Sequence, residues 1–76
     1  MRIHVKYFGV FRQKTGKKEE YVEKDVETVD DLIQLLKDIY GLDTGFLVAV
    51  NRKMVSSTET LSECDEVAVF PPVVGG

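Results

Sequence analysis

The residues best placed to do chemistry are the last two, Gly75 and Gly76, because we expect the terminal glycine to carry a free α-carboxylate. A carboxylate becomes an acyl donor only after activation, for example as a mixed anhydride with AMP, which supplies a good leaving group. Glycine has no Cβ and adopts almost any φ, so these two residues can thread a narrow channel in another protein. The sequence therefore predicts a chain end that a partner activates.

The run before the glycines, Pro71-Pro72-Val73-Val74, favours an extended course. Each proline restricts φ to roughly −65°, and consecutive prolines favour polyproline II geometry. Phe70 is biased toward extended geometry too, because it precedes a proline. We expect a single domain spanning residues 1–76 with a flexible C-terminal tail over residues 71–76, pointing away from the core. The alternative is a frayed terminus without a role.

No second catalytic constellation accompanies this tail in the sequence. His4 has no neighbouring Ser, Cys or acid in a triad-like arrangement. Cys64, the one cysteine, has no second Cys or His at the spacing of a zinc site. A redox role for Cys64 and a plain turn position both remain open. We expect a domain that supplies a reactive end group and binds no metal or cofactor of its own.

Composition indicates one small folded domain. The 76 residues are 43% apolar and 30% charged with a net charge of −3, enough for one compact core and too apolar for disorder. Basic residues are dispersed and offset by acids, which argues against nucleic-acid binding. No stretch approaches the ~20 apolar residues of a membrane span, and the N-terminus does not resemble a signal peptide. With a single cysteine, we expect a cytoplasmic protein.

Hydrophobic periodicity predicts five strands and one main helix. Alternation predicts strands over residues 3–7, 19–24, 46–50 and 66–70, with a short one at 54–55. Apolar spacings of three and four predict a helix over Val29–Tyr40, with Thr28 and Asp31 as a capping box and Gly41 as its C-terminal stop. A helical turn at residues 11–14, stopped by Gly16, is expected in the first connection.

One helix with one apolar stripe must cover one face of a mixed sheet. This predicts an α+β domain of the β-grasp, or ubiquitin-like, class, with four to five strands packed on the main helix. The first and last strands are the most apolar, so we expect them in the central positions of the sheet.

Three side chains are candidates for a partner interface on the face without the helix. Phe8 alternates away from the core residues of the first strand, and Phe70 does the same on the last strand, so the two rings should meet. Met54 could join them, because it lies near a turn of a neighbouring strand. Clustered exposed aromatics mark binding surfaces, and Phe and Met suit a surface that accepts two partners in turn. Ordinary packing at the base of the tail is the alternative.

The final segment resembles a known family. Asp65-Glu66-Val67-Ala68 followed by Phe70-Pro71-Pro72-Val73 and Gly75-Gly76 is similar to the C-terminus of the MoaD family, the ubiquitin-like sulfur-carrier subunits of molybdopterin synthase. The similarity continues upstream through Ala49-Val50-Asn51 and Tyr7–Arg12. Cys64 departs from the pattern, because the family usually has glycine in this turn.

The resemblance implies a reaction sequence. An E1-like activating enzyme of the MoeB type would adenylate Gly76 with ATP, and a sulfur donor protein would convert the adenylate to a thiocarboxylate. The tail would then enter a MoaE-like large catalytic subunit and donate sulfur for dithiolene formation in molybdenum cofactor biosynthesis. Phe8, Met54 and Phe70 would dock both partners, and Arg12 would pair with an acid of the activating enzyme. A solvated loop position is the alternative for Arg12.

Two other functions share the same activated end group. The chain could be a ubiquitin-like modifier joined through Gly76 to lysines, or a sulfur carrier for tRNA thiolation. A carrier for thiazole synthesis fits less well, because such carriers tend to be shorter and lack Phe-Pro-Pro-Val. The sequence leaves the sulfur donor, the final acceptor and the stoichiometry of any complex open.

Overall fold

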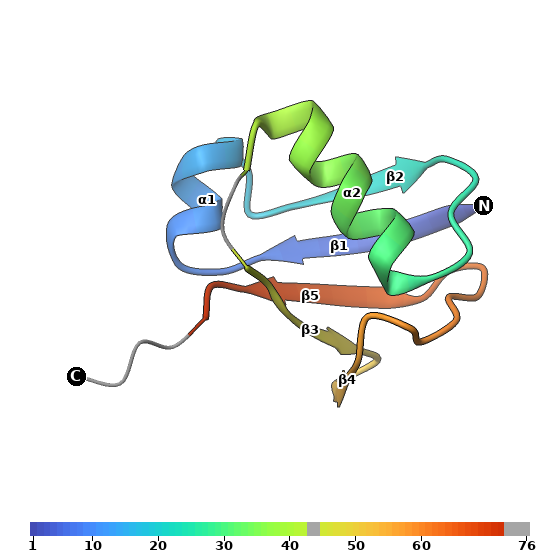
Figure 1. Ribbon diagram of the computed structural model, residues 1–76. Coiled ribbons are helices and arrows are strands. Elements are labelled where there is room, and N and C mark those ends of the chain that lie inside the picture. The colour runs from blue at the N-terminus through green and yellow to red at the C-terminus, as the bar shows by residue number, and fades with distance from the viewer. Residues whose placement is uncertain (43–44, 73–76) are drawn as a thin grey trace.

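The computed structural model describes residues 1–42 and 45–72, which form a sheet covered on one face by a helix (Figure 1). The elements in chain order are β1 (Arg2–Tyr7), α1 (Val10–Thr15), β2 (Glu19–Glu23), α2 (Val29–Tyr40), β3 (Leu47–Val50), β4 (Lys53–Val55) and β5 (Glu66–Phe70). The five strands are ordered β2-β1-β5-β3-β4. β1 and β5 run parallel, and the other neighbouring pairs are antiparallel. This is the predicted mixed β-grasp sheet, with the first and last strands in inner positions.

The main helix begins and ends where the sequence predicted. The Thr28 hydroxyl accepts a hydrogen bond from the Asp31 amide at 3.2 Å, and the Asp31 carboxylate accepts from the Thr28 amide at 3.2 Å. The amides of Glu27 and Thr28 lower the pKa of Asp31. Gly41 ends the helix in the left-handed conformation, with φ 67°, and its amide donates to the Lys37 carbonyl. A reciprocal cap of this kind satisfies amides that the first helical turn leaves without partners.

Side chains from the helix and from one face of the sheet fill the core. The helix contributes Val29, Leu32 and Leu36, while β1 and β5 contribute residues with no exposed surface. The fully buried side chains are Ile3, Val5, Tyr7, Phe11, Val29, Leu32, Leu36, Val67 and Val69. Ile39 was expected on the same stripe but is 54% exposed. At 100° per residue it falls to one side of the line through Leu36 and Tyr40.

Five elements differ from their predicted bounds, of which β1 begins at Arg2 and β2 ends at Glu23, each one residue earlier than expected. The helical turn in the first connection is a six-residue helix, α1, and it places Phe11 in the core. β3 begins at Leu47 rather than Phe46, whose ring instead stacks on Phe11 with centroids 4.7 Å apart. The turn before β4 is shorter than expected, because Asn51 and Arg52 both take positive φ (50° and 71°) and Lys53 already pairs with Val50. Two consecutive positive φ angles match the twist of a tight hairpin.

Candidate functional site: an apolar sheet face beside the tail

Strand register places a row of apolar side chains on the face that the helix leaves uncovered. Phe8 follows β1 on the side opposite the buried Tyr7. Directly opposed residues of a ladder point to the same side of a sheet. Leu47 is therefore on the face of its partner Phe70, and Met54 on the face of its partner Ala49. We call this surface the outer face and define it by Phe8, Leu47, Ala49, Met54, Ala68 and Phe70.

Phe8 and Phe70 stack directly on the outer face, as the alternation predicted. Their ring centroids lie 4.7 Å apart with planes inclined by 16°. The amide of Phe8 donates to the carbonyl of Val69 at 3.2 Å, which continues the parallel pairing of β1 and β5 by one residue. Both rings are half-buried, so each still presents apolar surface to solvent. Stacking between residues of two neighbouring inner strands fixes the two rings relative to each other, and their predicted docking role stays a prediction.

Arg12 lies at the rim of this aromatic pair. Its guanidinium carbon is 5.4 Å from the centre of the Phe8 ring, within the range of a cation–π interaction. Its Nε donates a hydrogen bond to the Tyr7 carbonyl at 2.9 Å, which fixes the side chain against β1. Within residues 1–42 and 45–72, no carboxylate forms an ion pair with Arg12. The predicted pairing of Arg12 with an acid of a partner stays a prediction.

Met54 lies on the outer face but not beside the two phenylalanines. It sits on β4, and β3 separates it from β5. Its side chain is 62% exposed. Leu47, which is 39% exposed, lies opposite Phe70 on the intervening strand and was not among the sequence candidates. The signal for Leu47 was present, because it alternates with the buried Val48 and must face away from the helix.

The base of the tail contacts the loop that follows β1. Pro71 is half-buried, and a Cβ added to Gly9 would lie 3.0 Å from the Pro71 Cγ. Pro72 is exposed and lies near Gly45, where an added Cβ would be 3.4 Å from the Pro72 Cγ. The other tail candidates, Val74, Gly75 and Gly76, lie outside the described residues. The structure therefore positions the start of the tail directly beside the Phe8–Phe70 stack.

A buried hydroxyl supports this end of β1 from the core side. The Tyr7 hydroxyl and the Tyr40 hydroxyl both donate to the Glu20 carboxylate, and the Lys17 ammonium donates to Glu20 and to the Tyr40 oxygen at 3.1 Å. Burial, with the neighbouring Glu20 charge, strongly raises the pKa of Tyr7. Burial alone would raise the pKa of Glu20, but its three donors outweigh that cost and lower it. The network ties β1, β2 and α2 together.

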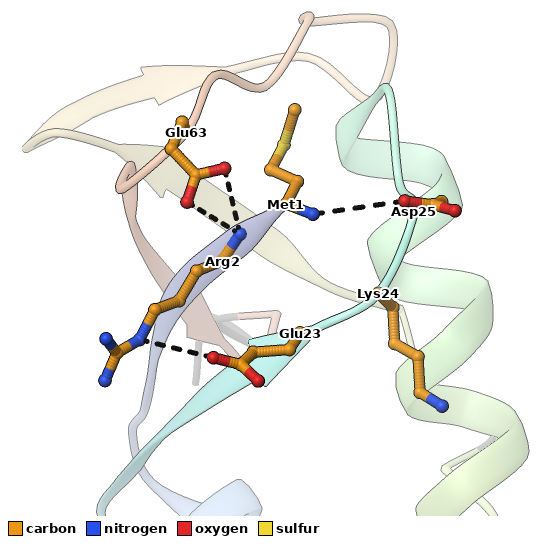
Figure 2. Close-up of a pocket in the computed structure, with 6 residues that line it drawn as sticks. All are labelled: Met1, Arg2, Glu23, Lys24, Asp25 and Glu63. Carbon is orange, nitrogen blue, oxygen red and sulfur yellow. Dashed lines mark hydrogen bonds and ion pairs between the residues drawn. The ribbon is translucent and has the colours of Figure 1, made fainter.

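The opposite end of the sheet carries charged rather than apolar groups. Figure 2 shows the N-terminal ammonium directed at Asp25, the Arg2 amide donating to both oxygens of Glu63, and the Arg2 side chain paired with Glu23. Nearby, His4 stacks on Tyr21 and pairs with Glu19. These charged groups form ion pairs and hydrogen bonds with one another, so we interpret the pocket in Figure 2 as a solvated hollow of the surface.

The described part of the chain contains neither a cluster of metal ligands nor a membrane-spanning helix. Within residues 1–42 and 45–72, no three His, Cys, Asp or Glu side chains come together as metal ligands. The helices described there are all too short or too polar to span a bilayer. Cys64 is exposed, in a turn where its φ is 67°.

The sequence pattern of the ThiS family matches residues 5–76. The chain belongs to the ThiS family. The molybdopterin synthase sulfur carrier subunit of Escherichia coli (strain K12) is 39% identical to it, and the match covers 97% of this chain and 99% of that protein. This relative confirms the resemblance to the MoaD group that the final segment indicated.

Solved structures of similar proteins show the same fold. The structure described as molybdopterin converting factor, subunit 1, from Pyrococcus furiosus has 36% identity and a TM-score of 0.84, covering 96% of this chain and 99% of that one. SAMP1 from Haloferax volcanii has 25% identity and a TM-score of 0.80, covering 100% of both chains. These structures confirm the predicted ubiquitin-like β-grasp fold for this chain.

Proposed function

We propose that this chain is the sulfur carrier and small subunit of a molybdopterin synthase. The observation that carries the proposal is its 39% identity, over nearly the full length of both proteins, to a sulfur carrier subunit of that enzyme. The Phe-Pro-Pro-Val-x-Gly-Gly ending and the aromatic stack at its base support the same assignment.

The chemistry proposed for the tail takes place on the carboxylate of Gly76. A carboxylate oxygen attacks the α-phosphorus of ATP, pyrophosphate leaves, and the carbonyl carbon becomes an acyl-adenylate. A persulfide on a donor protein then displaces AMP to give an acyl disulfide, and a second thiol cleaves its S–S bond to release the thiocarboxylate and leave a disulfide. The thiocarboxylate passes its sulfur to a pterin precursor, and hydrolysis returns Gly76 to the carboxylate. The activating enzyme uses the ATP, and this chain contributes the end group and the docking surface, a covalent strategy that divides one hard step into easier ones.

Two partner proteins follow from this proposal. An E1-like activating enzyme must reach Gly76 first, and a large catalytic subunit must receive the charged tail afterward. The outer face supports use by both, because Phe8 and Phe70 are half-buried beside the tail and Met54 is a flexible, polarisable contact. The Arg12 guanidinium is proposed to meet an acid of the activating enzyme. We also propose that the chain binds no cofactor and acts in the cytoplasm, where its single cysteine remains reduced.

Intact mass spectrometry tests the proposed function directly. The full chain is incubated with the activating enzyme, ATP and a sulfur donor, and then with the large subunit and the pterin precursor. The expected result is a mass increase equal to replacement of one oxygen by sulfur, located at Gly76 and reversed by the second incubation. Failure to detect this exchange with an enzyme that activates a known relative would overturn the proposal.

Protein conjugation is a second candidate, favoured by the similarity to SAMP1 from Haloferax volcanii, a small archaeal modifier protein. An acyl-adenylate that loads sulfur can equally be attacked by a lysine amine. Immunoblots of cell extracts distinguish the two functions. Covalent ladders that disappear when Gly76 is deleted would support conjugation, whereas a single free band with thiocarboxylate at its end would support sulfur transfer alone.

A further inference from the structure

We propose that Gly9 and Pro71 form a seat that sets the direction in which the chain leaves the domain, which makes Gly9 a positioning residue for activation of the C-terminus. The inference rests on the proposed function and adds a residue that lies far from Gly76 in the sequence. Its basis is the contact between the loop after β1 and the first residue after β5.

Gly9 is closely matched to the Pro71 ring. A Cβ at position 9 would lie 3.0 Å from Pro71 Cγ and 3.3 Å from Pro71 Cδ. Both atoms belong to a closed ring with little freedom to move, so a larger residue at position 9 would force the Pro71 ring or one of the two backbones to shift by a few tenths of an ångström. Gly9 also takes φ 59° and ψ −135°, a conformation that is essentially restricted to glycine. Sterics and backbone geometry therefore both require glycine at this position.

Rigid elements hold both sides of the seat. Gly9 is the N-cap of α1, and its carbonyl accepts a hydrogen bond from the Arg12 amide at 3.1 Å. Pro71 directly follows Phe70, which is stacked on Phe8 and paired in register with Leu47. The contact thus connects α1 to the central strand β5, and neither side can shift independently.

The following proline is held less closely. A Cβ at Gly45 would lie 3.4 Å from Pro72 Cγ, close to an ordinary van der Waals contact, and Pro72 is exposed. Pro71 is therefore the fixed point from which the chain departs. Because each proline also restricts its own φ, the position of the Pro71 ring limits the course of the residue after it.

The position of the departure point matters because activation requires the acyl group to meet ATP in a partner's active site. Displacement of a reacting group by about 1 Å can cost about 100-fold in rate, even when the cause is distant from the chemistry. The outer face provides the docking contacts, so a disturbed seat should lower kcat more than it raises KM.

Pro71→Ala and Pro72→Ala form a matched pair that tests this inference. Each removes one proline and its φ restraint, but only Pro71→Ala removes ring atoms that touch Gly9. ATP-dependent pyrophosphate exchange with the activating enzyme gives kcat and KM for the full chain. We expect Pro71→Ala to lower kcat by about tenfold or more, with KM little changed, and Pro72→Ala to have a clearly smaller effect.

Gly9→Ala extends the test, and the double variant with Pro71→Ala shows whether the two positions act through one contact. If they do, the double variant is no slower than the slower single variant, a non-additive result that independent sites would not give. Thermal melting checks that each variant is folded. If Gly9→Ala does not fold, the comparison of kcat between Pro71→Ala and Pro72→Ala still tests the inference, because both variants retain Gly9.

A nuclear Overhauser effect between the Gly9 Hα and Pro71 Hδ protons detects the contact between the two residues directly, without an activity assay. We expect it in the wild-type chain and in Pro72→Ala. Its absence from the wild type, or equal kcat for the two proline variants, would overturn the seat while leaving sulfur transfer intact. Absence of any exchange with the wild-type chain would instead overturn the proposed function, and the positioning role with it.

Discussion

Each end of the sheet carries a pair of stacked rings with an arginine over one of them, but the surroundings are apolar at one end and charged at the other. At one end Phe8 stacks on Phe70 with centroids 4.7 Å apart, and Arg12 lies over Phe8. At the other end His4 stacks on Tyr21, also at 4.7 Å, and Arg2 lies over Tyr21. Parallel pairing of β1 and β5 puts Pro71, the first residue of the tail, beside the first stack and the N-terminal part of β1 beside the second.

The difference between the stacks lies in what surrounds them. His4 is hydrogen-bonded to Glu19, and Arg2 forms an ion pair with Glu23, so the polar groups of the second stack have partners within the domain. The first stack joins two inner strands and continues into Leu47, with no carboxylate paired to its arginine in the described part of the chain. An aromatic pair with a cation above it therefore occurs at both ends of the sheet. We propose only the first stack as a binding site, because it is continuous with other apolar side chains and lies beside Pro71.

The largest expected effect comes from the tail itself. Deletion of Gly76 should abolish sulfur loading. The chain then ends one residue earlier, at Gly75, so its terminal carboxylate no longer reaches the position where activation occurs. The melting temperature should remain nearly unchanged, since the core residues all lie between Ile3 and Val69. Mass spectrometry and a melting curve measure the two effects. A large loss of stability would show that the end of the chain packs on the domain.

Substitution of Phe8 should produce the next largest effect and tests the comparison directly. Phe8→Ala should weaken binding to the large subunit by about 10-fold to 100-fold, because aromatic residues at the centre of an interface contribute most of its binding energy. Tyr21→Ala is the matched control at the other stack and should change binding little. Isothermal titration calorimetry with the large subunit compares them, and equal losses would mean that both stacks lie in the interface.

Two adjacent glutamates should differ in their contribution to stability. Glu20→Ala leaves the hydroxyl of the fully buried Tyr7 without its acceptor and should cost about 1–3 kcal/mol in the free energy of unfolding. Glu19→Ala removes only an exposed pair with His4 and should cost under about 1 kcal/mol. Urea denaturation of the two variants provides the comparison. A larger loss for Glu19→Ala would contradict the assignment of the network to the core.

The same network predicts how stability depends on pH. The folded pKa of Glu20 lies below its ordinary value of 4.5, so its contribution is present above that pH and is lost as pH falls through the folded pKa. The folded pKa of Tyr7 lies above its ordinary value of 10.0, so its contribution is present below pH 10 and is lost as pH rises further. Urea midpoints across these two windows should fall less in Glu20→Ala than in the wild type.

The smallest expected effect is a gain of stability at Cys64. Its φ of 67° is unfavourable for a residue with a Cβ, and its amide is held by the Arg2 carbonyl at 2.8 Å. Cys64→Gly should raise the free energy of unfolding by about 0.5–1 kcal/mol after the added flexibility of the unfolded chain is counted. Sulfur loading should not change. Loss of loading in this variant would assign the thiol a role in the chemistry.

Local patterns were sufficient for most of the fold. Alternation located the strands, because a strand with one buried face has a period of two, and the Thr28–Asp31 box located the start of the helix. The same alternation predicted that Phe8 and Phe70 would meet. It did not predict that α1 would bury Phe11 or that β3 would begin after Phe46, because those outcomes depend on one ring stacking on the other across the fold.

The sequence by itself determined the class of fold, the family and the chemistry of the chain end, since these depend on periodicity and on an uninterrupted motif. Only the tertiary structure showed that Leu47 extends the outer face, that Met54 is separated from the phenylalanines by a strand, and that Gly9 accommodates Pro71. Those contacts join residues far apart in the chain, and strand order and register decide which of them meet. The Gly-Gly ending was visible in the sequence, whereas the fixed point at its base was not.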